Sequence, residues 1–276
     1  MKLSEFYKIL DTVAPKSISD EYCAKYGAYD NSGVLVDTGE EIRGAVFSLD
    51  LNFKAIDEAI KQNANLIVTH HPAIYGKISD IRACDFSPLG EKLVKCIKHG
   101  ISVIAMHLNL DCAKGGIDES LQEGIILASK NEKAGAGTGS IVETAIMHTV
   151  ENGGYGRAYG VAETTLSSLV CGMQTVFGSN RIVYFCEGNK RVSRVASFCG
   201  SGADEESVAF AVRTGADTVV SSDFKHHVIS LAMEKGLSVI ALTHYASENY
   251  GFEKYYEKIR RQVNVPCAFV TQYELL

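Results

Sequence analysis

The hydrophobic and polar positions of the chain form two kinds of segment that alternate along it. Some are short runs of apolar and β-branched residues, which are typical of buried strands. Others carry apolar residues at helical spacing, as where Phe53, Ile56 and Ile60 share one face. Strands and helices in this order predict βαβ units and a mostly parallel sheet. We expect strands at residues 42–49, 66–69, 101–106, 158–162, 182–186 and 192–198, and helices at residues 2–14, 53–63, 89–98, 115–127 and 165–177.

Two segments of the first half of the chain recur in the second half in the same order. Residues 64–71 resemble residues 216–223, and residues 100–105 recur almost unchanged as residues 236–241. The repeat predicts two similar α/β halves that can face each other across a cleft. The common sequence pattern of βαβ units is an alternative explanation for the same match.

Glycine-rich stretches mark the expected boundaries between domains. Residues 131–140 are the best candidate for a linker, and residues 153–156 form a second expected break. We expect a first α/β domain of residues 1–130 with a C-terminal contribution from residues 240–276, and a second of residues 131–240. Each is predicted to be a three-layer α/β domain around a mixed, mostly parallel sheet, with the active site in the cleft between the two domains.

Composition narrows the classes of function. Hydrophobic residues make up 46% of the 276-residue chain, charged residues make up 22%, and the net charge is -6. This balance is typical of a soluble protein and argues against binding to nucleic acid or to an anionic membrane. The eight cysteines are scattered without a C-x-x-C pair, which excludes the common zinc-finger frameworks and favours reduced thiols. Because the sequence shows neither a signal peptide nor a membrane span, we expect a cytoplasmic protein.

Histidines and carboxylates gather where the predicted strands end. In two of the groups an acidic residue lies four positions after a histidine, which places both side chains on one face if the segment is helical. Adjacent histidines alternate between faces inside a strand, but at a strand end this constraint relaxes, and the pair can also reach two different ions. The groups are His70 with His71, His107 with Asp111, Asp223 with Lys225, His226 and His227, and His244 with Glu248.

Each group also has a purely structural explanation. A histidine at a strand end is often a satisfied polar residue, Asp111 can cap a turn, and Glu248 can be a surface residue of a helix. Four such groups at equivalent strand ends are harder to explain in this way, and together they favour a metal site. Mixed imidazole and carboxylate ligands suit zinc, manganese and iron.

Four motifs of the chain, taken together, point to a known family. They are Val68-Thr69-His70-His71-Pro72, His107-Leu108-Asn109-Leu110-Asp111, Gly200-Ser201-Gly202 and His244-Tyr245-Ala246-Ser247-Glu248. In this order they resemble the NIF-three-like proteins, whose members are commonly labelled GTP cyclohydrolase I type 2 homologues. Residues 31–33 and 154–157 extend the resemblance over nearly the whole chain.

The resemblance implies a dinuclear metal centre between two similar α/β domains, holding two divalent ions of zinc, iron or manganese per chain. Its carboxylates are able to bridge the two ions. It also implies a ring-like homohexamer whose sites face an internal cavity. The family's ligands correspond to His70, His71, Asp111, His244 and Glu248, and positions around the site, which are candidates for catalysis or substrate contact, correspond to His107, Asp223 and His227.

These residues predict a metal-dependent hydrolase of a small molecule such as a nucleotide or another phosphoester. A hydroxide made from water between the ions is the expected nucleophile, with His107 or His227 as proton carrier. The turn at residues 200–202 can hold a phosphate on its backbone N–H groups, or it can be a plain tight turn. The alternative is a non-enzymatic metal-binding or regulatory protein. Ionisable groups beyond those needed as ligands favour the enzyme, whereas the absence of a cysteine ligand departs from the best-known GTP cyclohydrolases.

Overall fold

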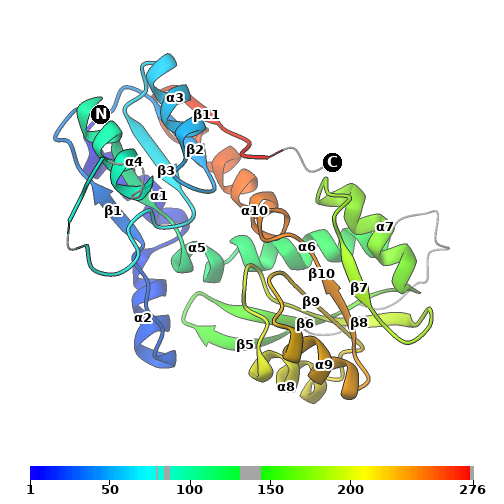
Figure 1. Ribbon diagram of the computed structural model, residues 1–276. Coiled ribbons are helices and arrows are strands. Elements are labelled where there is room, and N and C mark those ends of the chain that lie inside the picture. The colour runs from blue at the N-terminus through cyan, green and yellow to red at the C-terminus, as the bar shows by residue number, and fades with distance from the viewer. Residues whose placement is uncertain (79, 84–87, 131–143, 274–276) are drawn as a thin grey trace. The chain divides into compact units, whose positions relative to one another are not determined.

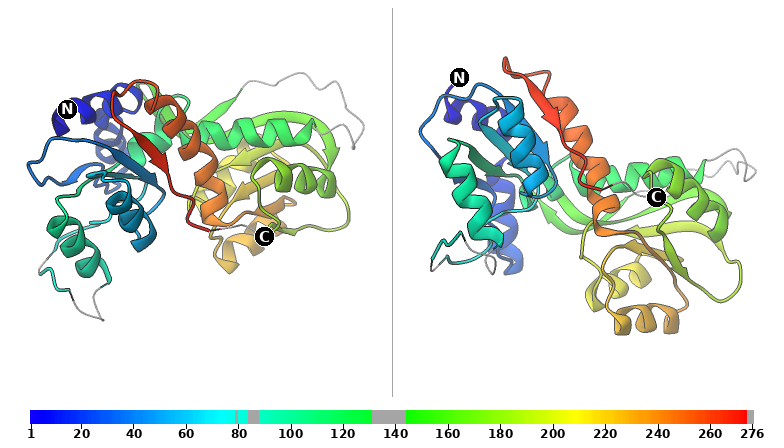
Figure 2. Two further views of the ribbon diagram at one scale, coloured as in Figure 1. Left: turned by 90° about the horizontal axis from the view of Figure 1, so that it is seen from above. Right: turned by 45° about the horizontal axis from the view of Figure 1, so that its top comes forward.

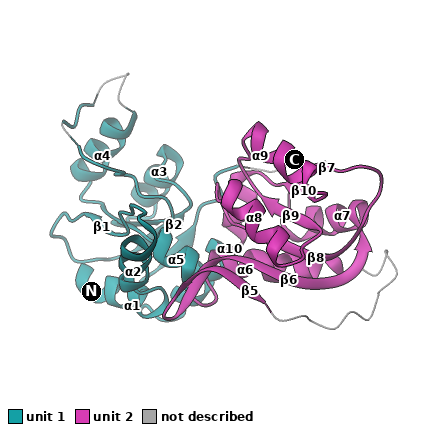
Figure 3. Cartoon of the chain, turned by 90° about the horizontal axis from the view of Figure 1, so that it is seen from below, with its two compact units in different colours: residues 1–113, 252–274 teal, residues 114–251, 275–276 magenta. Residues whose placement is uncertain are grey.

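A computed structural model describes residues 1–78, 80–83, 88–130 and 144–273 of the chain. The chain divides into two compact units, shown in different colours in Figure 3: a first unit of residues 1–113 and 252–274, and a second unit of residues 114–251 with 275–276. The domain boundaries expected near residues 130 and 240 remain predictions. The linker expected at residues 131–140 lies outside the described residues.

The first unit is built on a five-stranded sheet with the order β1-β4-β3-β2-β11. The pairs β4/β3, β3/β2 and β2/β11 are parallel, and only the edge strand β1 runs antiparallel to its neighbour in this sheet. Figure 2 shows the C-terminal strand β11, in red, beside β2, in blue. The strands are β1 (Gly33–Val36), β2 (Ala45–Ser48), β3 (Leu66–Thr69), β4 (Ser102–Ala105) and β11 (Cys267–Phe269).

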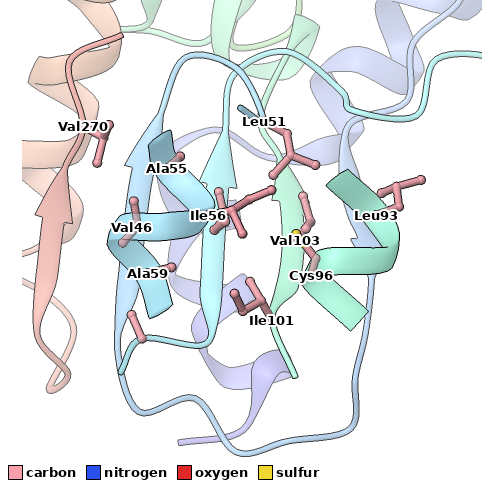
Figure 4. Close-up of a cluster of buried hydrophobic side chains, with 12 residues drawn as sticks. Val46, Leu51, Ala55, Ile56, Ala59, Leu93, Cys96, Ile101, Val103 and Val270 are labelled. Atoms are coloured by element: carbon pink, nitrogen blue, oxygen red, sulfur yellow. The ribbon is translucent and has the colours of Figure 1, made fainter. Parts of the chain in front are cut away.

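Helices cover both faces of this sheet. Side chains of α3 and α4, among them Ile56 and Leu93, pack against Val46 on one face (Figure 4). Successive strand residues point to opposite faces, so Phe47 packs on the other side, where its ring lies 5.2 Å from the ring of Tyr256 in α10. The helices with residues in this unit are α1 (Leu3–Val13), α2 (Lys16–Tyr26), α3 (Phe53–Lys61), α4 (Pro88–Lys98), α5 (Leu108–Cys112) and the C-terminal part of α10 (His244–Ile259).

The second unit is built on a six-stranded mixed sheet with the order β5-β6-β8-β9-β10-β7. The central pairs β8/β9 and β9/β10 are parallel, and the outer pairs are antiparallel. Helices α8 and α9 pack on one face through Val208 and Val228, and α6 and α7 lie on the other (Figure 1). The elements are α6 (Ile117–Ser129), β5 (Ala145–Val150), β6 (Gly153–Thr165), α7 (Leu166–Val176), β7 (Val183–Phe185), β8 (Arg191–Ser197), α8 (Glu205–Arg213), β9 (Thr218–Ser221), α9 (His226–Glu234) and β10 (Ser238–Ala241).

The two units confirm the predicted mixed α/β fold, and the sequence repeat corresponds to equivalent strand pairs. In the first unit β3 and β4 are parallel, with Leu66 opposite Ser102. In the second unit β9 and β10 are parallel, with Thr218 opposite Ser238. The repeated segments therefore occupy the same register in two separate sheets.

Two local predictions were wrong. Residues 16–26, which were not among the expected helices, form helix α2, because Ile18 and Tyr22 bury one narrow face in an otherwise polar segment. The break expected at residues 153–156 is the beginning of strand β6. Gly156 is needed there because a Cβ atom at this position would lie 2.7 Å from the ring of Phe198.

Candidate metal centre

The end of β3 presents two adjacent imidazoles. The backbone N–H groups of His70 and His71 both donate to the carbonyl oxygen of Leu49, at 3.1 and 3.0 Å. Because two successive N–H groups share one acceptor, the chain leaves the regular strand geometry at this point. Pro72 then ends the hydrogen-bond ladder of the strand, because it has no N–H. The ring centroids of the two histidines lie 4.9 Å apart. In a regular strand, two successive side chains would point to opposite faces of the sheet. At this strand end the two rings instead lie close together.

Hydrogen bonds fix the tautomers of both rings. The Nδ1 atom of His70 lies 2.8 Å from the carbonyl oxygen of Met106, which can only accept, so Nδ1 carries the proton. The Nδ1 atom of His71 lies 2.7 Å from Oδ1 of Asp50, and Asp50 also accepts from Nε2 of Gln272 at 2.6 Å. In both histidines this leaves Nε2 as the atom that can bind a metal ion, which is the usual arrangement of histidine ligands.

A third histidine and a carboxylate follow strand β4. His107 precedes helix α5, and the backbone N–H of Asp111 donates to its carbonyl oxygen at 2.9 Å, so both side chains leave one turn of the chain. Nε2 of His70 lies 3.5 Å from Oδ1 of Asp111. One donor atom each from His70, His107 and Asp111 all lie within 4.8 Å of one another. This group has the composition and spacing to hold a divalent ion.

A buried carboxylate stands behind His107. The Nδ1 atom of His107 lies 2.8 Å from Oδ1 of Asp30, and the Ser32 hydroxyl donates to the same carboxylate at 2.6 Å. Burial alone would raise the pKa of Asp30, but these hydrogen bonds and the nearby imidazole outweigh it and lower the pKa to about 2. For His107, burial acts to lower the pKa, whereas the hydrogen bond to Asp30 and the charges of Asp111 and Asp30 raise it, and the net change is upward.

The second unit holds a separate histidine–carboxylate pair at the start of α10. Nε2 of His244 lies 3.0 Å from Oε2 of Glu248, one helical turn later. Nδ1 of His244 lies 2.5 Å from Oδ2 of Asp223, a residue in the left-handed conformation with φ of 47°. The side chain of Glu248 is only 5% exposed, so a surface role for it is excluded. Asp223 orients His244 as Asp50 orients His71.

The glycine turn after β8 leaves room for Glu248. Gly200 has φ of 57°, and a Cβ atom on it would lie 2.2 Å from Oε1 of Glu248. Its N–H donates to Oγ of Ser247, and the Ser222 hydroxyl donates to its carbonyl at 2.5 Å. A side chain on Gly202 would collide with the hydroxyl of Tyr155. Close packing therefore accounts for both glycines of this turn.

The remaining sequence candidates lie apart from these contacts or act behind the ligands. His227 lies in α9 with Nε2 2.8 Å from Oε1 of Glu205, and both side chains are largely exposed. Asp30 and Asp50, which hold two of the imidazoles, were not among the sequence candidates. The sequence contained a signal that could have identified Asp50, since this carboxylate directly follows a predicted strand. Asp30 lies in a loop, and only its position beside residues 31–33 marked it.

The comparisons with known proteins place the chain in a family. A model of the family Duf34/NIF3 (NGG1p interacting factor 3) matches residues 1–274. The chain belongs to the Duf34/NIF3 family. It is 27% identical to a GTP cyclohydrolase 1 type 2 homolog of Clostridium perfringens, over 99% of this chain and 97% of that protein. It is 28% identical to the protein NIF3 homolog of Schizosaccharomyces pombe, over 89% of this chain and 84% of that one.

Solved structures show that this Duf34/NIF3 chain shares its fold with other proteins. A hypothetical protein of Staphylococcus aureus matches with a TM-score of 0.79 at 22% identity, covering 98% of this chain and 96% of that chain. Reduced HcgD from Methanocaldococcus jannaschii matches with a TM-score of 0.75 at 23% identity, covering 98% and 97%. Within the described part of this family member, no helix is long and apolar enough to span a bilayer.

Proposed function

We propose that the chain binds two divalent ions of zinc, iron or manganese through the five ligands His70, His71, Asp111, His244 and Glu248. The observation that carries the proposal is the distance of 3.5 Å between Nε2 of His70 and Oδ1 of Asp111, two of the proposed ligands, which follow β3 and β4. The Nδ1 hydrogen bonds described above support the same assignment, because they leave Nε2 of each histidine to the ion.

We propose that this centre is the active site of a metal-dependent hydrolase. Bound divalent ions supply the Lewis acidity that makes water a nucleophile near neutral pH. His107 is the proton carrier: Asp30 holds its Nδ1 proton, so Nε2 takes up or releases a proton toward the substrate. Asp223 positions His244. The proposed part of His227 in proton transfer rests on the family resemblance alone.

The proposed substrate is a small molecule, a nucleotide or another phosphoester. The relatives named as GTP cyclohydrolase 1 type 2 homologs support the nucleotide. Phosphoester hydrolysis suits a site of imidazoles and carboxylates, because two clustered divalent ions are a common means of stabilising charge in that reaction.

The first test measures metal content. Protein purified without chelators is expected to contain about two divalent ions per chain by elemental mass spectrometry. Glu248→Gln is expected to lose one or both ions and to keep its circular dichroism spectrum. Glu257→Gln is the matched control, because Glu257 lies on the same helix and pairs on the surface with Arg260 at 2.8 Å and with Arg261 at 3.5 Å. The absence of bound metal from the wild-type protein would contradict the proposed metal centre.

The second test separates the two possible parts of His107. Fully metallated protein is screened against nucleotides and other phosphoesters, and His107→Ala is expected to lower turnover by ~100-fold without loss of metal. Loss of metal in this variant would make His107 a ligand instead. A broad screen of the metallated wild type without turnover would favour the alternative function, a metal-binding or regulatory protein.

A further inference from the structure

The first unit contains a polar pocket with His71 in its wall. The pocket has a volume of about 490 Å³, within the range of small-ligand sites. Its walls come from the segments that follow three neighbouring parallel strands: Asp50 and Asn52 after β2, His71 after β3, and Gln272 after β11. In α/β sheets, this carboxyl edge is where ligands usually bind.

Most polar side chains of the pocket already have fixed partners. Asp50 accepts from His71 through Oδ1 and from Gln272 through Oδ2, and its own N–H donates to Oε1 of Gln272 at 3.2 Å. Asn52 caps helix α3 by accepting from the N–H of Ala55 at 2.8 Å. These bonds hold the shape of the pocket and occupy its carboxylate and amide groups.

Lys92 of α4 differs from the other polar residues that line the pocket. Its Nζ lies 5.9 Å from the ring centroid of Phe53, and it forms no ion pair with another residue among those described. Lys95, on the same helix and 5.5 Å from the same ring, is paired with Asp57 at 2.5 Å and does not line the pocket. Helices α3 and α4 also begin beside the pocket, and helix N-termini carry partial positive charge. Lys92 thus offers a ligand a cationic group without an ion pair, whereas the carboxylate oxygens of Asp50 are directed at His71 and Gln272.

We propose that this pocket binds an anionic group of the substrate, a phosphate or a carboxylate, through Lys92, while the reacting part of the same substrate lies at His71. The link to the reaction rests on the proposed function. The anion site itself does not rest on the proposed function, because the pocket is lined by protein side chains and needs no bound metal ion. A substrate with two separated functional groups, one reacting and one anionic, fits this arrangement.

The test measures anion binding by calorimetry to protein from which metal has been removed by chelation. The probes are GMP, inorganic phosphate and malonate, and the proteins are the wild type, Lys92→Met and Lys95→Met. Methionine keeps the apolar stem over Phe53 and removes the charge. Lys92→Met is expected to bind the preferred probe at least about tenfold more weakly than the wild type, and Lys95→Met is expected to bind it as the wild type does.

The three probes distinguish a phosphate site from a carboxylate site. The metal content of the protein distinguishes a failure of the anion site from a failure of the proposed hydrolase. Binding of GMP and phosphate assigns a phosphate site, whereas binding of malonate alone assigns a carboxylate site. Failure of all three probes to bind the wild type, or equal binding by Lys92→Met, overturns the anion site even if the protein holds two metal ions. Anion binding that depends on Lys92 in a protein that never binds metal would keep the pocket and reject the proposed hydrolase.

Discussion

At the scale of single residues, one arrangement recurs around the candidate ligands. A protein oxygen accepts a hydrogen bond from the Nδ1–H of each of four histidines, His70, His71, His107 and His244, and three of these four oxygens belong to carboxylates. The result is the same in every case: Nε2 is left for an ion or for proton transfer. Each histidine therefore has its own orienting residue. Only some of these orienting residues lie near a ligand in the sequence. They are Met106 for His70, Asp50 for His71, Asp30 for His107 and Asp223 for His244.

Gly200→Ala tests whether the glycine turn makes room for Glu248. The new methyl group would lie 2.2 Å from Oε1 of Glu248, so we expect the carboxylate to move and metal content to fall. Gly178→Ala is the control, because Gly178 has a similar φ of 60° and nothing within 4 Å of the added atom. The control is expected to lose about 1 kcal/mol of stability from backbone strain and to keep its metal. Equal metal content in the two variants would contradict the role given to Gly200.

The depressed pKa of Asp30 predicts a loss of stability in acid. Its folded pKa of about 2 lies below the ordinary value of 3.8, so its contribution is fully present above pH 4 and is lost as the pH falls toward 2. We expect metal-free wild type to lose about 2 kcal/mol more of its unfolding free energy over this interval than Asp30→Asn. Urea titrations at several pH values measure the difference. Parallel pH profiles for the two proteins would contradict the prediction.

At the scale of elements, the second unit is held together behind the glycine turn by a buried ion pair. Asp118 of α6 accepts from Nε of Arg157 at 3.0 Å, and both side chains are buried. The same carboxylate accepts from the backbone N–H groups of Gly156 in β6 and Cys199 after β8, at 3.0 and 3.2 Å. One carboxylate thus joins a helix and two strands, next to Gly200.

Asp118→Asn is expected to destabilise the protein by about 3–5 kcal/mol, because it leaves the charge of Arg157 buried without a partner. Urea unfolding followed by circular dichroism gives this value. Asp20→Asn is the control, since Asp20 pairs with Lys16 at 2.5 Å on the surface and is worth less than about 1 kcal/mol. A cost for Asp118→Asn no larger than that of the control would show that the pair does not hold the two elements.

At the scale of the whole molecule, each unit orients its own ligand candidates with its own residues. The partners of His70, His71 and His107 all belong to the first unit, and the partner of His244 belongs to the second. Each set is therefore oriented by hydrogen bonds within its own unit, and metal-free protein is expected to keep these hydrogen bonds.

The assembly is also a prediction at this scale. The family resemblance predicts a ring-like homohexamer, which closed symmetry allows without exposing further interfaces. Light scattering coupled to size-exclusion chromatography is expected to give six times the 29.9 kDa of the chain. A monomer at micromolar concentration would contradict the prediction, and a dimer or trimer would show incomplete closure.

The sequence by itself determined the alternation of helices and strands, the paired strands and the family. These features follow from local apolar periodicity and from short motifs, as in residues 66–71, where a buried run ends in two histidines and a proline. The helix at residues 16–26 was missed because few apolar residues mark its buried face.

Only the tertiary structure decided which groups act on which. Asp30 and His107 are 77 positions apart in the chain, and Asp50 and Gln272 are 222 positions apart, yet each pair shares a hydrogen bond. Likewise, the need for glycine at position 200 arises from a carboxylate 48 residues later. Such contacts form because a sheet brings together the ends of strands that are far apart in the sequence. Local sequence patterns do not indicate which strand ends become neighbours.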